Sequence, residues 1–198
     1  MPEKPRMHAF IDESVATPEK GRSRNFYILS VAYVAPQDFA IAREELLRAA
    51  SSDFMHATDL LRSSTGRDEL LRLCSCVPPS VQIEIFFMEP LLAGDRQGEA
   101  TRIALFKRLL DSLQDVRPFV VDEVIYESRR DGYMRQADNR TMRELTARHP
   151  QVHLRPQTPG AEKLLWIADL AAAAFRQSTM WGNDSYLEAF SSRPQLKD

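Results

Sequence analysis

The segment 161–177 constrains the fold more than any other part of the chain. It predicts one helix that is apolar on nearly all sides, and a helix of this kind is buried. Its run of alanines at 171–174 favours close packing against a sheet. Asp169 stands in the middle of it. Because burying an unpaired ionised carboxylate is costly, Asp169 must be protonated, metal-bound or paired with an arginine, unless the helix face opens to water there.

The segment 7–14 predicts a buried strand that ends in carboxylates. Asp12 and Glu13 directly follow its apolar residues. Since successive strand side chains point to opposite faces, one of the two acids is expected to face a given site, and we favour Asp12. A carboxylate at the end of a core strand is a candidate metal ligand. The alternative is that these residues simply open a turn.

A second acidic pair lies inside the predicted strand 119–126. Asp122 and Glu123 have apolar residues on both sides, so a turn explains them less well than it explains Asp12. Alternation places the two carboxylates on opposite faces of the sheet. The pattern does not choose which of them faces a site.

The remaining pattern predicts an α/β fold. Apolar runs predict strands at 7–14, 26–34, 81–88, 119–126 and 151–155, and helical periodicity predicts helices at 37–50, 67–76, 98–113 and 161–177. The first two strands are expected to pair antiparallel. We expect one domain over residues 1–180 and a loosely held tail over 181–198, which is polar and lacks a sustained period.

Composition excludes few classes of protein. The 198 residues carry a formal charge of −2, so the overall charge does not indicate a nucleic-acid binder. The most apolar segment, 164–175, is too short to span a bilayer, and the sequence indicates a cytoplasmic protein without a membrane partner. Cys74 and Cys76 suit neither a disulfide framework nor a zinc site.

Two further groups of residues are candidates for a site. His56 is a candidate proton carrier, although a lone histidine is more often an ordinary surface residue. The segment 129–148 is locally basic and could lay guanidinium groups along a phosphate backbone. Solvated arginines on an exposed helix are an equally good interpretation. The candidate nucleic-acid-binding residues are Arg129, Arg130, Arg135, Arg140 and Arg143.

Three acids therefore stand in apolar settings: Asp12, Asp122 or Glu123, and Asp169. Sites for Mg²⁺ or Mn²⁺ use a few carboxylates from different elements. Such ions serve phosphodiester hydrolysis, so the pattern favours a nuclease-type site.

Four stretches carry a resemblance to a known family: Phe10-Ile11-Asp12-Glu13-Ser14, the aromatic strand at 26–34, the segment 54–60 around His56, and Leu165-Trp166-Ile167-Ala168-Asp169-Leu170-Ala171. In this order they resemble the bacterial family catalogued as domain of unknown function 3800. The resemblance implies a ribonuclease H-like mixed sheet flanked by helices.

The resemblance also implies site residues. Asp12 and Asp169 would be metal ligands, with Asp122 or Glu123 as the acid of the central strand, and His56 matches the family's histidine. A further ligand would have to come from Asp59 or Glu69, so chemistry with one metal and with two metals both stay open.

These observations lead to three hypotheses. The first is a divalent-metal-dependent phosphodiesterase that hydrolyses DNA or RNA, with a mobile-element or defence setting implied by the resemblance. The second is a non-catalytic module of the same fold that binds nucleic acid or protein, with the acids paired to arginines. The third is a hydrolase of a small phosphorylated metabolite. The sequence leaves the oligomeric state open.

Overall fold

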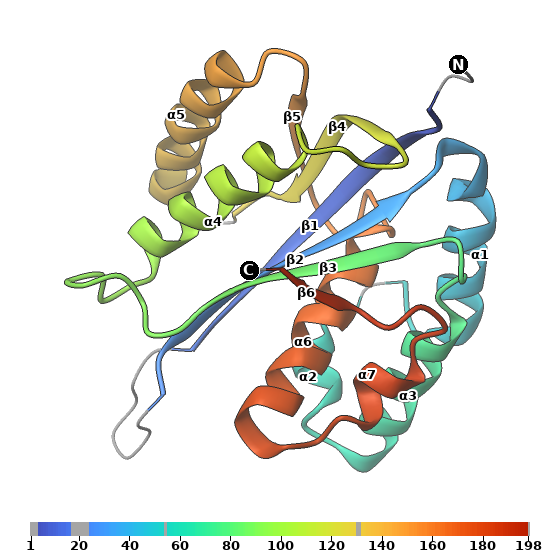
Figure 1. Ribbon diagram of the computed structural model, residues 1–198. Helices are drawn as coiled ribbons and strands as arrows, with labels where there is room; N and C mark the ends of the chain where they lie inside the picture. The colour runs from blue at the N-terminus through green and yellow to red at the C-terminus, as the bar shows by residue number, and fades with distance from the viewer. Residues whose placement is uncertain (1–3, 17–23, 54, 130–131, 198) are drawn as a thin grey trace.

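A six-stranded mixed sheet forms the centre of the protein (Figure 1). The computed structural model describes residues 4–16, 24–53, 55–129 and 132–197. The strand order is β5-β4-β1-β2-β3-β6. In the centre of the sheet, β2 pairs antiparallel with β1 on one side and with β3 on the other. On the outer sides, β4 and β5 run parallel to β1, and β6 runs parallel to β3. The strands are β1 Arg6–Ala16, β2 Phe26–Val34, β3 Gln82–Met88, β4 Val120–Glu127, β5 His153–Gln157 and β6 Gln195–Lys197.

Helices cover both faces of this sheet, and each face has its own apolar core. One face carries α4 Glu99–Ser112 and α5 Gly132–Arg148. The other face carries the 3-10 turn Pro36–Asp38 and the helices α1 Phe39–Ala49, α2 Ala57–Leu60, α3 Ser64–Cys76, α6 Leu165–Trp181 and α7 Ser185–Ala189. The α/β class with a mixed sheet between helices is as predicted.

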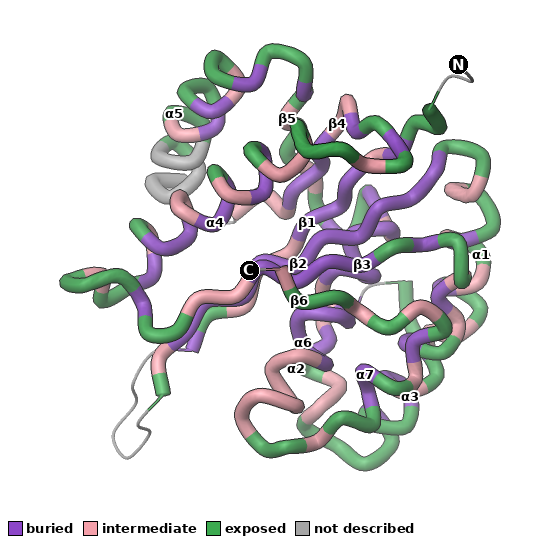
Figure 2. The backbone as a smooth tube through the Cα atoms, in the orientation of Figure 1, coloured by how far each residue is buried: buried purple, intermediate pink, exposed green. Residues whose placement is uncertain are grey.

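Alternation along β1 supplies both cores. Phe10 points into the core beneath α6, and Ala9 and Ile11 point into the core beneath α4. Every residue of β2 is buried, as expected of a strand with paired neighbours and helices on both faces (Figure 2). The predicted antiparallel pairing of these two strands is confirmed.

Helix α6 lies across β1 and β2 because its small residues permit a close approach. Ala168, Ala171 and Ala172 are almost fully buried. At the contact, Ser30 Oγ of β2 donates a hydrogen bond of 2.5 Å to the carbonyl oxygen of Ala168. The prediction that this helix is buried against the sheet is confirmed.

The C-terminal segment differs from the prediction of a loosely held tail. Tyr186, Leu187 and Phe190 belong to the core beneath α6, and β6 adds an edge strand beside β3. The apolar segment is too short to show this packing, because four apolar residues in the six from 185 to 190 do not establish a helical or strand period.

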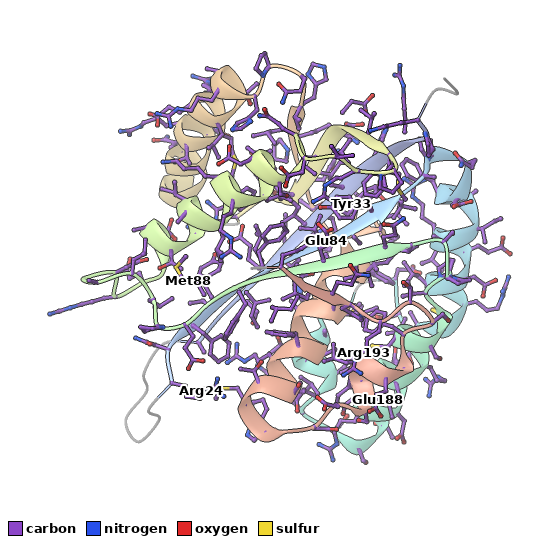
Figure 3. The ribbon with its side chains drawn as sticks, viewed as in Figure 1. Arg24, Tyr33, Glu84, Met88, Glu188 and Arg193 are labelled. Atoms are coloured by element: carbon purple, nitrogen blue, oxygen red, sulfur yellow. The ribbon has the colours of Figure 1, made fainter. Side chains whose placement is uncertain are left out.

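A buried ionic network holds this edge strand. Glu84 of β3 is 7% exposed, accepts a 2.7 Å hydrogen bond from Tyr33 Oη, and pairs with both terminal nitrogens of Arg117 at 3.1 Å (Figure 3). Lys197 Nζ of β6 lies 3.2 Å from Glu84 Oε1. The carboxylate thus links the edge strand to the interior of the sheet.

Within the described residues, no helix combines the length and apolar character required to cross a membrane.

Candidate active site

Two acids from opposite ends of the chain, Asp12 and Asp169, meet between β1 and α6. The sheet register places Asp12 opposite Ser30 on β2, and Ser30 holds the carbonyl of Ala168, the residue before Asp169. The carboxyl groups of Asp12 and Asp169 line the same cleft, and the charge of Asp169 acts on Asp12. Asp12 lies in the interior of β1, which continues to Ala16, so the expectation that the strand ends at the acids is wrong.

A third acid, Glu127, approaches them from β4. Because β4 runs parallel to β1 with Ile11 opposite Tyr126, the next residue on each strand brings Glu127 beside Asp12. The charge of Glu127 acts on both Asp12 and Asp169. Glu127 is not among the predicted site residues because it stands at the polar end of its strand, before Ser128 and Arg129.

These acids line a cleft of about 400 Å³ at the ends of β1 and β4. The cleft also includes groups that hydrogen bond or carry charge, from the start of α2 and the segment after β4. Its lining residues are Asp12, Glu13, Val15, Tyr27, His56, Thr58, Glu127, Ser128, Arg129 and Asp169.

Burial and the charges of neighbouring acids raise the pKa values of Asp12 and Asp169. Burial raises the pKa of Asp12 well above its ordinary value, and the nearby charges of Asp169 and Glu127 raise it further. Burial likewise raises the pKa of Asp169 to about 6, against the opposing effects of the Ala57 N–H and of His56. A proton on either carboxyl group therefore relieves the repulsion between the pair in the absence of a cation.

Asp169 is positioned by the start of α2. Its Oδ2 accepts a 2.9 Å hydrogen bond from the backbone N–H of Ala57. The preceding residue, His56, places Nδ1 3.9 Å from the same oxygen, with its side chain 30% exposed in the cleft. His56 therefore lies within reach of both the acid pair and a molecule that enters the cleft.

Glu13 is held by partners on the opposite face of β1. Its Oε2 accepts hydrogen bonds from Tyr27 Oη and, at 2.6 Å, from Nε of the buried Arg102. The helix that carries Arg102 approaches closely at Gly98, whose φ is 84° and where a Cβ would come within 2.9 Å of the Tyr27 ring. Burial and the charge of Glu13 raise the pKa of Tyr27, so it remains a neutral hydrogen-bond donor.

Asp122 and Glu123 do not line the cleft that holds Asp12 and Asp169. They lie near the other end of β4, and the five residues from Asp122 to Glu127 span about 16 Å of strand. Asp122 Oδ2 pairs with Arg6 Nη1 at 3.3 Å. Glu123 pairs with His8 Nδ1 at 3.0 Å and with Arg155 Nε at 2.6 Å. Each of the two has an arginine partner outside the cleft, and Glu127 is the acid of β4 that lines it.

Asp59 and Glu69, the candidates for a further metal ligand, also lie outside the residues that line the cleft. Asp59 is paired with Arg62 at 3.1 Å on the surface. Glu69 accepts hydrogen bonds of 2.6 Å from the backbone N–H and the hydroxyl of Ser51.

The candidate nucleic-acid-binding arginines separate into groups. Arg129 lines the cleft, and Arg143 of α5 lines a hollow farther along the same side of the molecule. Arg140 is exposed on α5 without lining these hollows. Arg130 lies outside the described residues, as does the side chain of Arg135.

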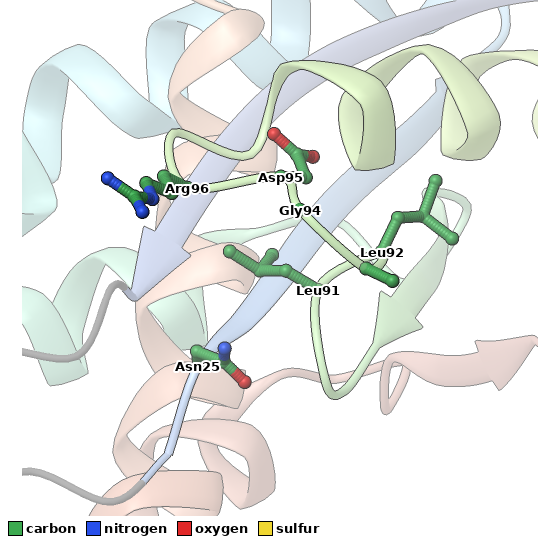
Figure 4. Close-up of a pocket in the computed structure, with 7 residues that line it drawn as sticks. Asn25, Leu91, Leu92, Gly94, Asp95 and Arg96 are labelled. Atoms are coloured by element: carbon green, nitrogen blue, oxygen red, sulfur yellow. The ribbon is translucent and has the colours of Figure 1, made fainter.

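A larger hollow, of about 560 Å³, lies beside the loop that follows β3 (Figure 4). Asp95 is the acid among its described lining residues, and its carboxylate accepts hydrogen bonds from the backbone N–H groups of Gly98 and Thr101 and from the Thr101 hydroxyl. This carboxylate shapes the loop, so the smaller cleft remains the candidate site.

The acid pair fits a divalent cation better than it fits two free charges. Oxygen ligands from separate elements suit Mg²⁺ or Mn²⁺. A cation would take the place of a proton in relieving the repulsion between Asp12 and Asp169. As they stand, no three histidine, cysteine or acidic side chains among the described residues are close enough to hold a metal ion. Binding through three acids therefore requires Glu127 to move closer.

Comparisons with known proteins support the fold. No protein-family model matches the chain, and no curated protein matches its sequence. Among solved structures, it is similar to a point mutant of Bst-RNase HIII, with a TM-score of 0.50 and 14% identity. The match covers 91% of this chain and 56% of that one, so this chain spans just over half its length. The likeness confirms a ribonuclease H-like fold and, at this identity, nothing finer.

Proposed function

We propose that this protein is a divalent-metal-dependent phosphodiesterase that hydrolyses nucleic acid at the cleft around Asp12 and Asp169. The observation that carries the proposal is the convergence of these two partly buried carboxyl groups, 157 positions apart in the sequence, on one cleft, where the charge of Asp169 helps to raise the pKa of Asp12. A purely structural role would be served by pairing each acid with a cation, as at Asp122 and Glu123. Here, instead, the charges that raise the pKa of Asp12 come from other acids.

The metal-binding residues would be Asp12 and Asp169, with Glu127 as a third acid. A bound Mg²⁺ or Mn²⁺ supplies Lewis acidity, which polarises the phosphodiester and favours attack by water. The Ala57 N–H keeps the Asp169 carboxylate oriented toward Asp12. The ribonuclease H-like fold and the divalent cation chemistry of such a donor set support the same proposal.

His56 and Arg129 would act directly on the substrate. The partly exposed imidazole of His56 lines the cleft, where it can hold or transfer a proton at the leaving oxygen. The guanidinium of Arg129 also lines the cleft and can donate to phosphate oxygens. Membership of the family catalogued as domain of unknown function 3800, with a role in mobile elements or defence, belongs to the same proposal.

The test is cleavage of end-labelled single- and double-stranded DNA and RNA in the presence of Mg²⁺ or Mn²⁺. The wild-type protein should cleave at least one of these substrates, and excess chelator should stop the reaction. Asp12→Asn keeps the size of the side chain and removes its charge, so cleavage should fall about a hundredfold or more.

Circular dichroism of Asp12→Asn provides the folding control. Equal cleavage by the two folded proteins would remove the proposal. Association with nucleic acid without turnover at any metal concentration would instead support the non-catalytic binding module.

A further inference from the structure

Two more hollows continue from the carboxylate cleft along one side of the molecule. The first, of about 310 Å³, shares Ser128 and Arg129 with the cleft. The second, of about 500 Å³, shares Tyr126, Asn139 and Pro156 with the first. We call the two together the α5 groove, because α5 and the ends of β4 and β5 form its walls.

The chemistry changes where the cleft joins this groove. The cleft is lined by four acids, whereas no described residue that lines the α5 groove is acidic. The groove instead presents Arg129 at its inner end, Arg143 at its outer end, and the side-chain amides of Asn139 and Gln157. A polyanion is repelled by the first surface without a bound cation and attracted by the second.

We propose that the nucleic-acid strand leaves the cleft over Ser128 and Arg129 and runs along the α5 groove, with phosphates near Arg129 and Arg143. This inference rests on the proposed function for the position of the scissile phosphate. It identifies the substrate as a polynucleotide strand rather than a mononucleotide. The recognised chemistry is the sugar–phosphate backbone, which RNA and DNA share.

The dimensions of the groove agree with this substrate. Its outer hollow follows α5 from Asn139 to Ala147, and eight residues of helix span about 12 Å. At the spacing along one stacked strand, about 3.4 Å, this length holds roughly three nucleotides. A mononucleotide bound in the cleft would not contact the α5 groove.

Arg129 is held in position at the entrance to the groove. Its Nη1 lies 2.7 Å from Glu99 Oε1, and its side chain is 21% exposed. Glu99 is not among the residues that line either hollow. The ion pair therefore orients the guanidinium between the cleft and the groove, where it can contact the phosphate that follows the scissile one.

The test measures binding separately from cleavage. Fluorescence anisotropy with labelled single-stranded DNA and RNA, in excess chelator, gives Kd for the full-length protein over a range of salt concentrations. Arg143→Gln should raise Kd about fivefold at low salt. It should also reduce the slope of log Kd against log salt by about one, as expected for the loss of one phosphate contact.

Arg72→Gln is the matched control. Arg72 is exposed on α3, which packs on the opposite face of the sheet, and its replacement removes the same charge from the same kind of position. Its Kd and salt slope should equal those of the wild type. Equal effects of Arg143→Gln and Arg72→Gln would overturn the inference, and so would the absence of wild-type binding at low salt. Tighter binding of either the DNA or the RNA probe would show whether the groove prefers deoxyribose or ribose.

Failure of the inference and failure of the proposed function give different results. Hydrolysis of the small phosphodiester bis(p-nitrophenyl) phosphate requires only the cleft. If the wild type hydrolyses this small phosphodiester but Arg143→Gln binds strands like the wild type, the proposed path of the strand along the α5 groove is wrong and the proposed function stands. If no phosphodiester is hydrolysed but Arg143→Gln weakens strand binding as expected, the strand binds along the α5 groove as proposed and the proposed function is wrong.

Discussion

Asp12 and Asp169 lie partly buried in one cleft, where a full charge on each would be costly. The raised pKa values of both carboxyl groups are a consequence of this placement. A carboxyl group whose pKa is raised in the native state retains its proton to a higher pH than it does in the unfolded chain. The native state is therefore favoured at low pH by this pair and loses that contribution as the pH rises.

The first prediction concerns this pH dependence. In excess chelator, the stability that Asp169 contributes should be present below its ordinary pKa of 3.8 and should be lost as the pH rises through about 6. Asp169→Asn can still accept the hydrogen bond from the Ala57 N–H. Above about pH 6, the unfolding free energy of Asp169→Asn should exceed that of the wild type by on the order of 1–3 kcal/mol.

Urea denaturation of both proteins from about pH 4 to about pH 7 measures the difference between their unfolding free energies. Saturating Mg²⁺ should reduce this difference, because a cation takes the place of the proton only in the wild type. A difference that is independent of pH would contradict the raised pKa of Asp169.

At the scale of elements, the parallel pairing of β1 and β4 decides which acids meet. The register brings Glu127 to Asp12, whereas it leaves Asp122 near the start of both strands beside Arg6. A shift of one residue would turn Glu127 to the other face of the sheet. The composition of the site thus depends on strand register as well as on residue type.

The second prediction compares the two acids of β4. Glu127→Gln should lower metal-dependent cleavage by about tenfold to a hundredfold, because it removes the third carboxylate of the cleft. Asp122→Asn removes the same charge from the same strand outside the cleft, so its cleavage rate should match that of the wild type. Single-turnover cleavage under saturating metal distinguishes the two, and a larger loss in Asp122→Asn would show that the acids have been assigned wrongly.

The third prediction concerns the edge strand β6. Glu84→Gln leaves the guanidinium of Arg117 buried without its counter-charge and weakens the contact with Lys197. Stability should fall by about 3 kcal/mol. Amide exchange at Gln195–Lys197 should become faster than elsewhere in the sheet. Glu188→Gln, on the exposed surface of α7, is the control and should change neither quantity (Figure 3). Unchanged exchange in β6 would argue against the role of this network.

At the scale of the whole molecule, the sequence predicts the layers but not all of the site. The buried helix that carries Asp169 and the strand that carries Asp12 are evident because a carboxylate in an apolar segment is unusual. Their meeting depends on Ser30 and on the alanines of α6, which no local pattern connects. The family resemblance anticipated the fold, which the structure confirms.

Where the structure differs from the predictions, the physical cause is the same: each residue concerned contacts residues that are distant in the sequence. Asp122 looked like a site residue because the pattern does not show that Arg6 neutralises it. Glu127 was not among the predicted site residues because only strand pairing brings it to Asp12. The tail looked loose because its few apolar residues are buried by other elements, α3 and α6.

The central claim is that Asp12 and Asp169 jointly hold a divalent cation. Titration of Mn²⁺ into the protein near neutral pH, followed by the paramagnetic resonance signal of the free ion, measures this binding directly. We expect saturable binding by the wild type and by Asp122→Asn, and loss of that binding in Asp12→Asn and in Asp169→Asn. Binding that survives in either of the last two variants, or that is absent from the wild type, would contradict it.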